Sequence, residues 1–374
     1  MKLLLTNFHD GDGGGHTTYL LALASRLAAT HEVHVAAPAS SRLLQEAQRV
    51  PGVHAHVQSF PNGLGALGEL RHARARLHAL IARTGVDVVH VNGSADHRLV
   101  LSALRGLAHR PRVVLTKHNS KAMTGLGHWW RARRTDAVIA VSAHTLAMLQ
   151  ASPYARGPMH LVRNGVDTHA FAPWPSELRD EARQAAFGEV ELLLGSCAGT
   201  AAHKGWMDLA RAIALLPEAD RARVGVLLCG KPPSGAQRDE LAALGVASRF
   251  RFIGPLDDVR PAIAGIDAGF VLSTAVETIS FACREMMAMG KPVLVTRYAG
   301  LPENVTEGED GWVVPVNDPA AIAAVLSGML ADPERLKAMG AHAREHAERT
   351  FGIDGFIDAT LAAYANPEAL RATA

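Results

Sequence analysis

Short apolar runs alternate with longer amphipathic segments along most of this chain, and that alternation constrains the fold more than any other feature. In the first half, apolar runs predict strands at residues 2–7, 31–37, 86–91, 112–116 and 137–141. Residues 17–29 carry leucines at helical spacing. Strands separated by helices need crossover connections, which give a parallel sheet. We therefore predict an α/β fold whose ligands bind beyond the carboxyl ends of the strands.

The same alternation restarts after a proline-containing stretch at residues 171–175. It predicts strands at 192–198, 224–229, 250–253, 268–272 and 292–296, and a helix at 205–216. The final segment, 351–364, again has helical spacing. A chain of 374 residues has room for roughly two to three domains. We expect one domain at 1–170, a second at 171–350 and a final helical segment at 351–374.

Charge is distributed unevenly between the two halves. Up to residue 168 the chain carries 19 Lys and Arg against 9 Asp and Glu, whereas the remainder carries 19 against 27. Such asymmetry indicates two domains with different partners. The basic first half should attract an anionic partner.

Composition excludes disordered and fibrous proteins. Apolar residues make up 48% of the chain and charged residues 20%, which is the balance of a globular protein. No stretch approaches the roughly 18 apolar residues of a membrane span. The three cysteines are far apart in apolar sequence, which indicates reduced core residues rather than a disulfide or zinc framework.

Asp10 and Asp12 have the spacing of a metal-binding pair, but a solvated polar loop explains them better. We expect a cytoplasmic protein.

Two loops carry residue types suited to an anionic, oxygen-rich ligand. The glycine run at 13–15 follows the first strand, where glycine lets the backbone approach a ligand and helix amides favour an anion. A plain tight turn is an equally good interpretation. Lys204 precedes a helix in the second half, as a point charge for phosphate in an inter-domain crevice. The alternative is a solvated surface lysine.

A pair of glutamates and one histidine complete the candidate site. Glu277 and Glu285 flank a loop that becomes a helix, and paired carboxylates suit the hydroxyls of a ribose and a hexose. The alternative is an exposed loop glutamate plus a helix glutamate paired with Arg284 or Lys291. His118 ends a strand of the first half and can donate or accept a hydrogen bond near neutral pH.

Taken in order, these motifs resemble the retaining glycosyltransferases of family four. The E-x7-E motif of that family is matched by Glu277 and Glu285, and its lysine–glycine turn by Lys204 and Gly205. Other segments match along almost the whole chain: the glycine loop at Gly14 and Gly15, the T-x-H element at Thr116 and His118, and the N-G-V-D linker from Asn164 to Asp167.

The resemblance implies the GT-B fold: two Rossmann-like doubly wound domains facing a central cleft, with the C-terminal helix crossing back to the first domain. It implies that a nucleotide-diphosphate sugar lies mostly on the second domain. There Glu285 would hold the ribose, Glu277 would contact the transferred sugar, and Lys204 would neutralise the diphosphate. The resemblance also implies that Gly14 and Gly15 approach the sugar or phosphate. The family commonly carries an arginine with the lysine of the phosphate loop, and here the chain departs from that pattern. We expect Thr200 and His203, in the same loop as Lys204, to contribute to donor binding. His118 would face the sugar on the acceptor side.

The implied activity is transfer of a sugar, from a UDP-sugar by preference, to a glycan or lipid-linked acceptor in cell-envelope polysaccharide or lipopolysaccharide synthesis. We expect retention of configuration, with no metal and no other cofactor. A nucleotide-sugar epimerase or sugar phosphorylase of the same fold is one alternative. A non-catalytic nucleotide-sugar binding protein is another.

A basic segment of the first half points to a charged surface. Between Asp96 and Asp136 there are nine basic residues and no acidic one, and residues 128–131 read HWWR. Tryptophan beside arginine suits a lipid headgroup interface. Core tryptophans beside a solvated arginine face are the alternative. Nucleic acid is not expected, because no nucleic-acid module accompanies the charge. We hypothesise an anionic membrane surface or a phosphorylated lipid-linked glycan as partner, with the protein peripheral on the inner face of the cytoplasmic membrane.

Overall fold

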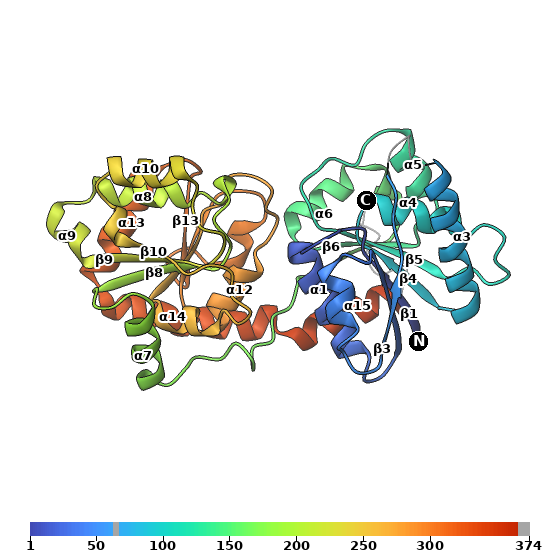
Figure 1. Cartoon of the computed structure of the whole chain (residues 1–374), viewed down its shortest axis with the longest axis horizontal. Helices are drawn as coiled ribbons and strands as arrows, with labels where there is room; N and C mark the ends of the chain where they lie inside the picture. Colours follow the sequence, from blue (N-terminus) through green and yellow to red (C-terminus); the bar gives the residue numbers. More distant parts are fainter. Residues whose placement is uncertain (63–66, 366–374) are drawn as a thin grey trace. The chain divides into compact units, whose positions relative to one another are not determined.

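The computed structural model describes residues 1–62 and 67–365. It divides into two compact units. Unit 1 comprises residues 1–165 together with the segment from Ile353 onward, and unit 2 comprises Val166–Gly352. Each unit is a parallel sheet covered by helices on both faces, as Figure 1 shows. The predicted α/β class, with two doubly wound units, is confirmed.

The sheet of unit 1 has seven parallel strands in the order β3-β2-β1-β4-β5-β6-β7. Central Leu3 pairs with Val33 on one side and Val88 on the other. The strands are β1 (Lys2–Thr6), β2 (Glu32–Ala37), β3 (Val53–Val57), β4 (Val88–Val91), β5 (Arg112–Lys117), β6 (Ala137–Ala140) and β7 (Met159–Leu161). The central strands are almost wholly buried, which explains their continuous apolar runs.

Helices cover both faces of the unit 1 sheet. Leu4, Val89 and Val113 pack in one cluster with the apolar side chains of α3 and α4. Figure 1 shows α1 and α15 together, away from α3 and α4. The helices of unit 1 are α1 (Gly14–Leu27), α2 (Arg42–Ala47), α3 (Leu67–Thr84), α4 (Ser94–Ala103), α5 (Leu126–Ala132), α6 (Ala143–Gln150) and α15 (Ile353–Ala365).

The last helix, α15, is part of the core of unit 1. It packs on α1, β5 and β6. The hydroxyl of Tyr364 lies 2.6 Å from Nδ1 of the buried His90. The rings of Phe356 and Tyr19 meet at 5.2 Å. A side chain at Gly165 would lie 2.7 Å from Cβ of Phe356, so only glycine fits where the chain leaves this unit.

The sheet of unit 2 has six parallel strands in the order β10-β9-β8-β11-β12-β13. They are β8 (Leu192–Ser196), β9 (Val224–Leu228), β10 (Phe250–Phe252), β11 (Ala268–Val271), β12 (Val293–Thr296) and β13 (Gly311–Val314). The helices are α7 (Ser176–Ala186), α8 (Trp206–Leu215), α9 (Glu218–Arg223), α10 (Gly235–Ala243), α11 (Arg260–Gly265), α12 (Phe281–Ala288), α13 (Pro319–Ala331) and α14 (Pro333–Phe351).

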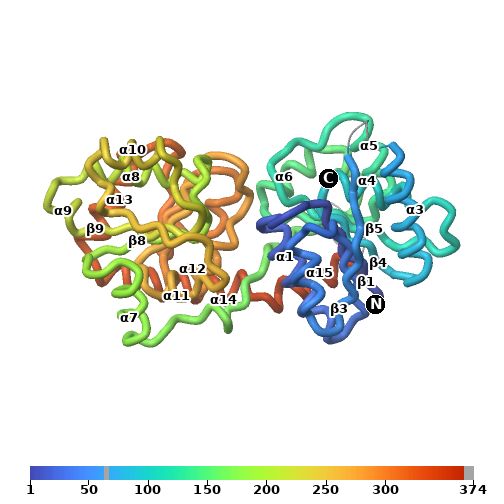
Figure 2. The backbone as a smooth tube through the Cα atoms, viewed as in Figure 1, coloured from blue at the N-terminus to red at the C-terminus, as the bar shows by residue number. Residues whose placement is uncertain are grey.

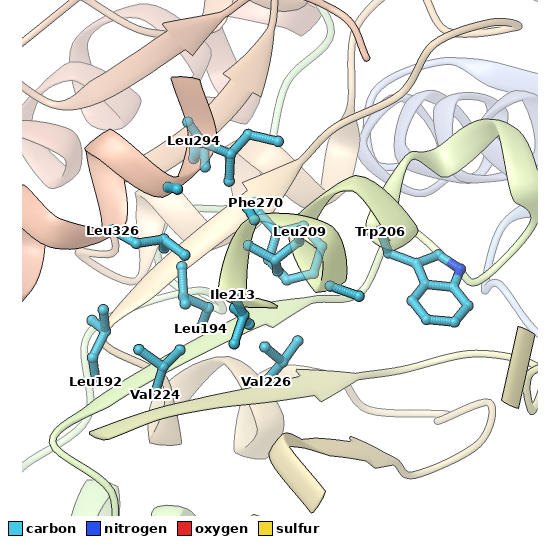
Figure 3. Close-up of a cluster of buried hydrophobic side chains, with 14 of the residues drawn as sticks. Leu192, Leu194, Trp206, Leu209, Ile213, Val224, Val226, Phe270, Leu294 and Leu326 are labelled. Atoms are coloured by element: carbon cyan, nitrogen blue, oxygen red, sulfur yellow. The ribbon is translucent and has the colours of Figure 1, made fainter. Parts of the chain in front are cut away.

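Two apolar layers hold the unit 2 sheet between its helices. On one face, Leu194 and Phe270 of the sheet pack against Trp206 and Leu209 of α8 and Leu326 of α13 (Figure 3). The opposite face packs against α11, α12 and α14, which lie near one another in Figure 2. Buried apolar side chains of this size contribute roughly 1.5–3 kcal/mol each.

Strand prediction was incomplete at the sheet edges. The strands that the sequence did not predict, β3, β7 and β13, are each the outermost strand of a sheet. Edge strands are short and less buried, so their apolar pattern is weak. Residues 53–57 read VHAHV and none of them is fully buried.

Both sheets reverse their strand order once, which marks where ligands bind in such folds. The reversal lies between β1 and β4 in unit 1 and between β8 and β11 in unit 2. Loops that leave the carboxyl ends of such strands diverge to opposite faces and leave a crevice. Across the described residues, no helix combines the length and the apolar character needed to span a bilayer.

Candidate functional site

An ion pair occupies the strand-order reversal of unit 2. Nζ of Lys204 lies 2.8 Å from Oε2 of Glu277, and these side chains are 20% and 12% exposed. Lys204 comes from the loop after β8, and Glu277 from the loop after β11. Ser273 Oγ donates to the same carboxylate oxygen at 3.3 Å. Val276, just before Glu277, has a φ of 55°, which a β-branched residue rarely adopts. Such strain is concentrated at functional sites.

Gly205 brings the two loops together. It has a φ of +69°, and a Cβ there would lie 1.9 Å from the carbonyl oxygen of Leu272, so no other residue fits. The backbone N–H of Thr274 donates to the carbonyl of His203 at 2.8 Å. The loop that carries Lys204 therefore packs directly on the loop that carries Glu277.

Thr200 and His203 have supporting positions in the same loop. Thr200 is buried, and its hydroxyl donates to the carbonyl of Lys231. Its own carbonyl accepts a hydrogen bond from the Trp206 indole at 2.9 Å. His203 is half-buried and holds Thr274 through its backbone. These contacts make Thr200 a residue that shapes the loop.

Glu285 is a half-buried carboxylate in the second turn of α12. Burial raises its pKa to about 7. The alternative partners do not reach it: Arg284 donates to Asn304 at 2.8 Å, and Lys291 donates to backbone carbonyls of Ala264 and Ile266. Within residues 1–62 and 67–365, no side chain forms an ion pair or hydrogen bond with this carboxylate. Glu285 therefore has acceptor capacity for hydroxyl groups.

His118 lies in unit 1, directly after β5. Its Nε2 is 2.7 Å from Oδ1 of Asn92. The amide nitrogen of Asn92 donates to the Thr6 carbonyl at 3.1 Å, so Oδ1 faces His118 and Nε2 of the histidine carries the proton. The ring packs 4.3 Å from His16 and 4.6 Å from Tyr19. Burial lowers the pKa of His118 well below its ordinary value, so the ring is neutral and acts through hydrogen bonds.

Gly14 and Gly15 form the first turn of α1 and are exposed. The helix begins earlier than its leucine pattern indicated, because Gly13 takes a left-handed conformation at the N-cap. The N–H of Gly14 donates to the Asp12 carboxylate at 3.1 Å, so an anionic group already lies at this helix terminus. Asp12 also pairs with Arg42.

The sequence did not indicate Lys117, the last residue of β5, as a site residue. It is buried, and its ammonium donates to Oδ1 of Asn119 at 2.8 Å and to the carbonyl of Lys121. Burial, together with Lys121, lowers its pKa to about 8. In the described part of the chain, no carboxylate pairs with Lys117. It lines a cavity of about 170 Å³ that His118 and His128 also line. The feature of the sequence that could have identified Lys117 is the position of a lysine at the end of an apolar strand.

The two tryptophans of α5 have different environments. Trp129 is 43% exposed, and the guanidinium of Arg133 lies 3.6 Å from its ring centroid. Trp130 packs against the unit 1 core, with Arg134 at 4.3 Å. The core interpretation therefore holds for Trp130, whereas Trp129 presents an aromatic and cationic surface.

Family comparisons cover both halves of the chain. Residues 13–170 match the family described as Glycosyltransferase Family 4, and residues 192–332 match Glycosyl transferases group 1. A D-inositol 3-phosphate glycosyltransferase of Thermomonospora curvata is 30% identical over 95% of this chain and 91% of its own. A GDP-mannose-dependent alpha-(1-6)-phosphatidylinositol monomannoside mannosyltransferase of Mycolicibacterium smegmatis is 28% identical, over 92% and 93%.

The fold is shared with solved enzymes. Anabaena HepE, in a structure with UDP, matches 96% of this chain and 98% of its own with a TM-score of 0.80 at 19% identity. HepE has also been solved with UDP-glucose. Together with the motif Glu277-x7-Glu285 and the Lys204–Gly205 turn, these matches show that the chain belongs to glycosyltransferase family 4 and is a hexosyl-type glycosyltransferase with GT-B domains.

Proposed function

We propose that this enzyme transfers a hexosyl group from a nucleotide-diphosphate sugar, by preference a UDP-sugar, to an anionic glycan or lipid-linked acceptor. The observation that carries the proposal is the 2.8 Å contact between Lys204 and Glu277 at the strand-order reversal of unit 2. It places a cation suited to a diphosphate beside a carboxylate suited to sugar hydroxyls. Glu285, on the following helix, would take the ribose hydroxyls.

The donor arrangement determines how the leaving group is stabilised. As the glycosidic bond breaks, negative charge grows on the diphosphate, and fixed positive groups lower the barrier. Lys204 and the amide groups at the start of α8 would meet that charge, so we propose that no metal is required. Retention of configuration is proposed from the resemblance to retaining enzymes. The HepE complexes with UDP and UDP-glucose support a UDP-sugar, whereas the mannosyltransferase relative uses GDP-mannose by name.

The acceptor side is proposed from unit 1. Lys117 supplies a buried positive charge beside His118, in a cavity of about 170 Å³ large enough for a phosphate or carboxylate group. His118 donates its Nε2–H to Asn92, so its Nδ1 would accept a hydrogen bond from a hydroxyl of the transferred sugar. The Thermomonospora relative is named for a phosphorylated inositol acceptor, which supports an acceptor with a phosphate. A role in cell-envelope polysaccharide or lipopolysaccharide synthesis would fit such an acceptor.

Peripheral membrane binding is part of this proposal. Trp129 of α5 and Arg133, directly after the helix, form a stacked, exposed pair suited to the boundary between lipid headgroups and acyl chains. Liposome co-sedimentation should show low-salt binding to anionic vesicles and none to neutral ones. The variant W129S/R133S should lose it. If the wild type does not bind anionic vesicles, a soluble acceptor is favoured.

The decisive experiment is a panel of UDP-, GDP- and ADP-sugars, scored by thermal shift and then by turnover. Sugars of one of the three nucleotides should raise the melting temperature of the protein, and the protein should hydrolyse them slowly when no acceptor is present. Lys204→Ala should lower turnover more than donor affinity, because the diphosphate charge grows in the transition state. The matched control is Lys337→Ala, which removes an exposed lysine of α14 and should leave both turnover and donor affinity unchanged. Binding without turnover would favour a binding protein, and epimerised donor an epimerase.

A further inference from the structure

Two cysteines meet at the base of the loop that carries Lys204. Cys197 directly follows β8, and Cys229 directly follows β9. Their sulfur atoms are 3.0 Å apart, and both thiols are free. Cys283, the remaining cysteine, is buried in α12. The sequence predicted reduced core cysteines, and a separation of 32 positions along the chain conceals that two of them are neighbours.

The parallel pairing of β8 and β9 explains this contact. Ser196 and Leu228 are the last register pair of the two strands, so Cys197 and Cys229 are the next pair along. The N–H of Cys229 donates to the carbonyl of Ser196 at 3.0 Å and holds that register. Neighbouring strands are about 4.8 Å apart, and disulfides join Cα atoms about 4.4–6.8 Å apart. The backbone therefore already has a spacing that a disulfide accepts.

We propose that Cys197 and Cys229 form a reversible disulfide when the protein meets a peroxide, and that this bond weakens nucleotide-sugar binding. The disulfide is inferred from the contact between the two sulfur atoms and from the strand register. The weaker binding rests on the proposed function, because that function assigns the loop after β8 to donor binding.

The chemistry needs one equivalent of hydrogen peroxide. The Cys229 thiolate attacks one peroxide oxygen, the O–O bond breaks, and the departing hydroxide becomes water with the proton of the Cys229 thiol. Cys229 is then a sulfenic acid. The Cys197 sulfur attacks the Cys229 sulfur, the S–S bond forms, the S–O bond breaks, and hydroxide leaves as water with the Cys197 proton. Two thiols are oxidised, and one peroxide is reduced to two waters.

The two sulfurs have different tasks in this sequence. The Cys197 thiol donates a hydrogen bond to the Cys229 sulfur, which lowers the pKa of Cys229 and raises that of Cys197. Cys229 is therefore the sulfur that ionises and attacks first, and Cys197 is the thiol that resolves the sulfenic acid.

Both cysteines are coupled to the donor loop. Thr200, three residues after Cys197, donates its hydroxyl to the carbonyl of Lys231, two residues after Cys229. A Cβ on Gly230 would lie 3.0 Å from Cα of Gly199, so the two loops are in direct backbone contact. Joining the sulfurs would therefore shift the segment that leads to Lys204.

Peptide mapping tests the bond itself. After peroxide treatment of the folded protein, tryptic peptides 184–204 and 224–238 should be found linked, and dithiothreitol should separate them. Cys283→Ala is the matched control and should still form the link. Cys197→Ala and Cys229→Ala should not. If peroxide leaves both thiols free in the wild type, or drives each to sulfinic acid without a link, the proposal is wrong.

Titration calorimetry with UDP-glucose tests the consequence. The oxidised wild type should bind about tenfold more weakly than the reduced protein, as for the loss of roughly one hydrogen bond to a charged group. Dithiothreitol should restore the affinity, and bound UDP-glucose should slow formation of the link. A linked protein with unchanged affinity would overturn the effect on binding. If the reduced protein binds no nucleotide sugar, the donor assignment fails, while the mapping result still decides whether the disulfide forms.

Discussion

Donor affinity should depend on pH through Glu285. Burial raises the pKa of this carboxyl to about 7, and no described side chain pairs with it. Only the ionised carboxylate accepts hydrogen bonds from two ribose hydroxyls with both oxygens. With a pKa near 7, about a tenth of the molecules are ionised at pH 6 and about nine-tenths at pH 8. The dissociation constant for UDP-glucose should therefore fall about tenfold from pH 6 to pH 8.

Titration calorimetry with wild type and Glu285→Gln provides the test. UDP-glucose is suitable because its diphosphate diester does not titrate in this range. At pH 8 the variant should bind about tenfold more weakly, consistent with roughly 1.5–3 kcal/mol for a hydrogen bond to a charged group. At pH 6 the difference should nearly vanish. Glu240→Gln, in α10, removes a carboxylate that pairs with Arg211, and it should behave as wild type in donor binding. If Glu285→Gln keeps the same pH dependence, Glu285 does not hold the donor.

Three further perturbations test other parts of the structure. Activity should persist in EDTA, because Lys204 and helix amides are proposed to supply the positive charge; loss restored by Mg²⁺ or Mn²⁺ would contradict that. Gly205→Ala should lower the free energy of unfolding by about 1–3 kcal/mol more than Gly188→Ala. Both glycines have a positive φ, but only at Gly205 would the added Cβ clash with a backbone carbonyl. Equal urea midpoints for the two variants would refute this. Burial lowers the pKa of His97 to about 3 in the folded protein, whereas the unfolded chain keeps the ordinary histidine pKa of about 6.5. As the pH falls below about 6.5, the unfolded chain takes up a proton at His97 that the folded protein does not, so this histidine lowers the free energy of unfolding. His97→Gln should therefore be less harmful at pH 5.5 than at pH 7.5, by about 1.4 kcal/mol in urea unfolding; an unchanged difference would mean that His97 is not held neutral.

Local sequence patterns were sufficient for the buried interior of both sheets. The central strands are long apolar runs because parallel strands are covered on both faces. The same patterns placed Lys204 and Glu277 in loops after strands, and the structure brings these two side chains into contact. The contact itself depends on β8 and β11 being neighbours, which no local pattern determines.

Features that depend on long-range pairing could not be predicted. Asn92 fixes the proton of His118 because β4 and β5 are adjacent, and it has no motif of its own. In the sequence, Lys117 is one of nine basic residues between Asp96 and Asp136, and burial in the folded protein distinguishes it. The start of α1 at Gly14 was missed because the helix is capped by backbone conformation and by Asp12, not by an apolar periodicity.

The position of α15 in the core of unit 1 has a consequence for synthesis on the ribosome. Unit 2 ends at Gly352 and contains no part of α15, so it can complete its fold without that helix. Unit 1 is translated first but must wait, with its groove for α15 uncovered, until Phe356 and Tyr364 emerge. A released chain that stops before Ile353 should therefore hold a folded unit 2 and an unfinished unit 1, the reverse of the order of translation. Premature termination near the C-terminus would damage the N-terminal half.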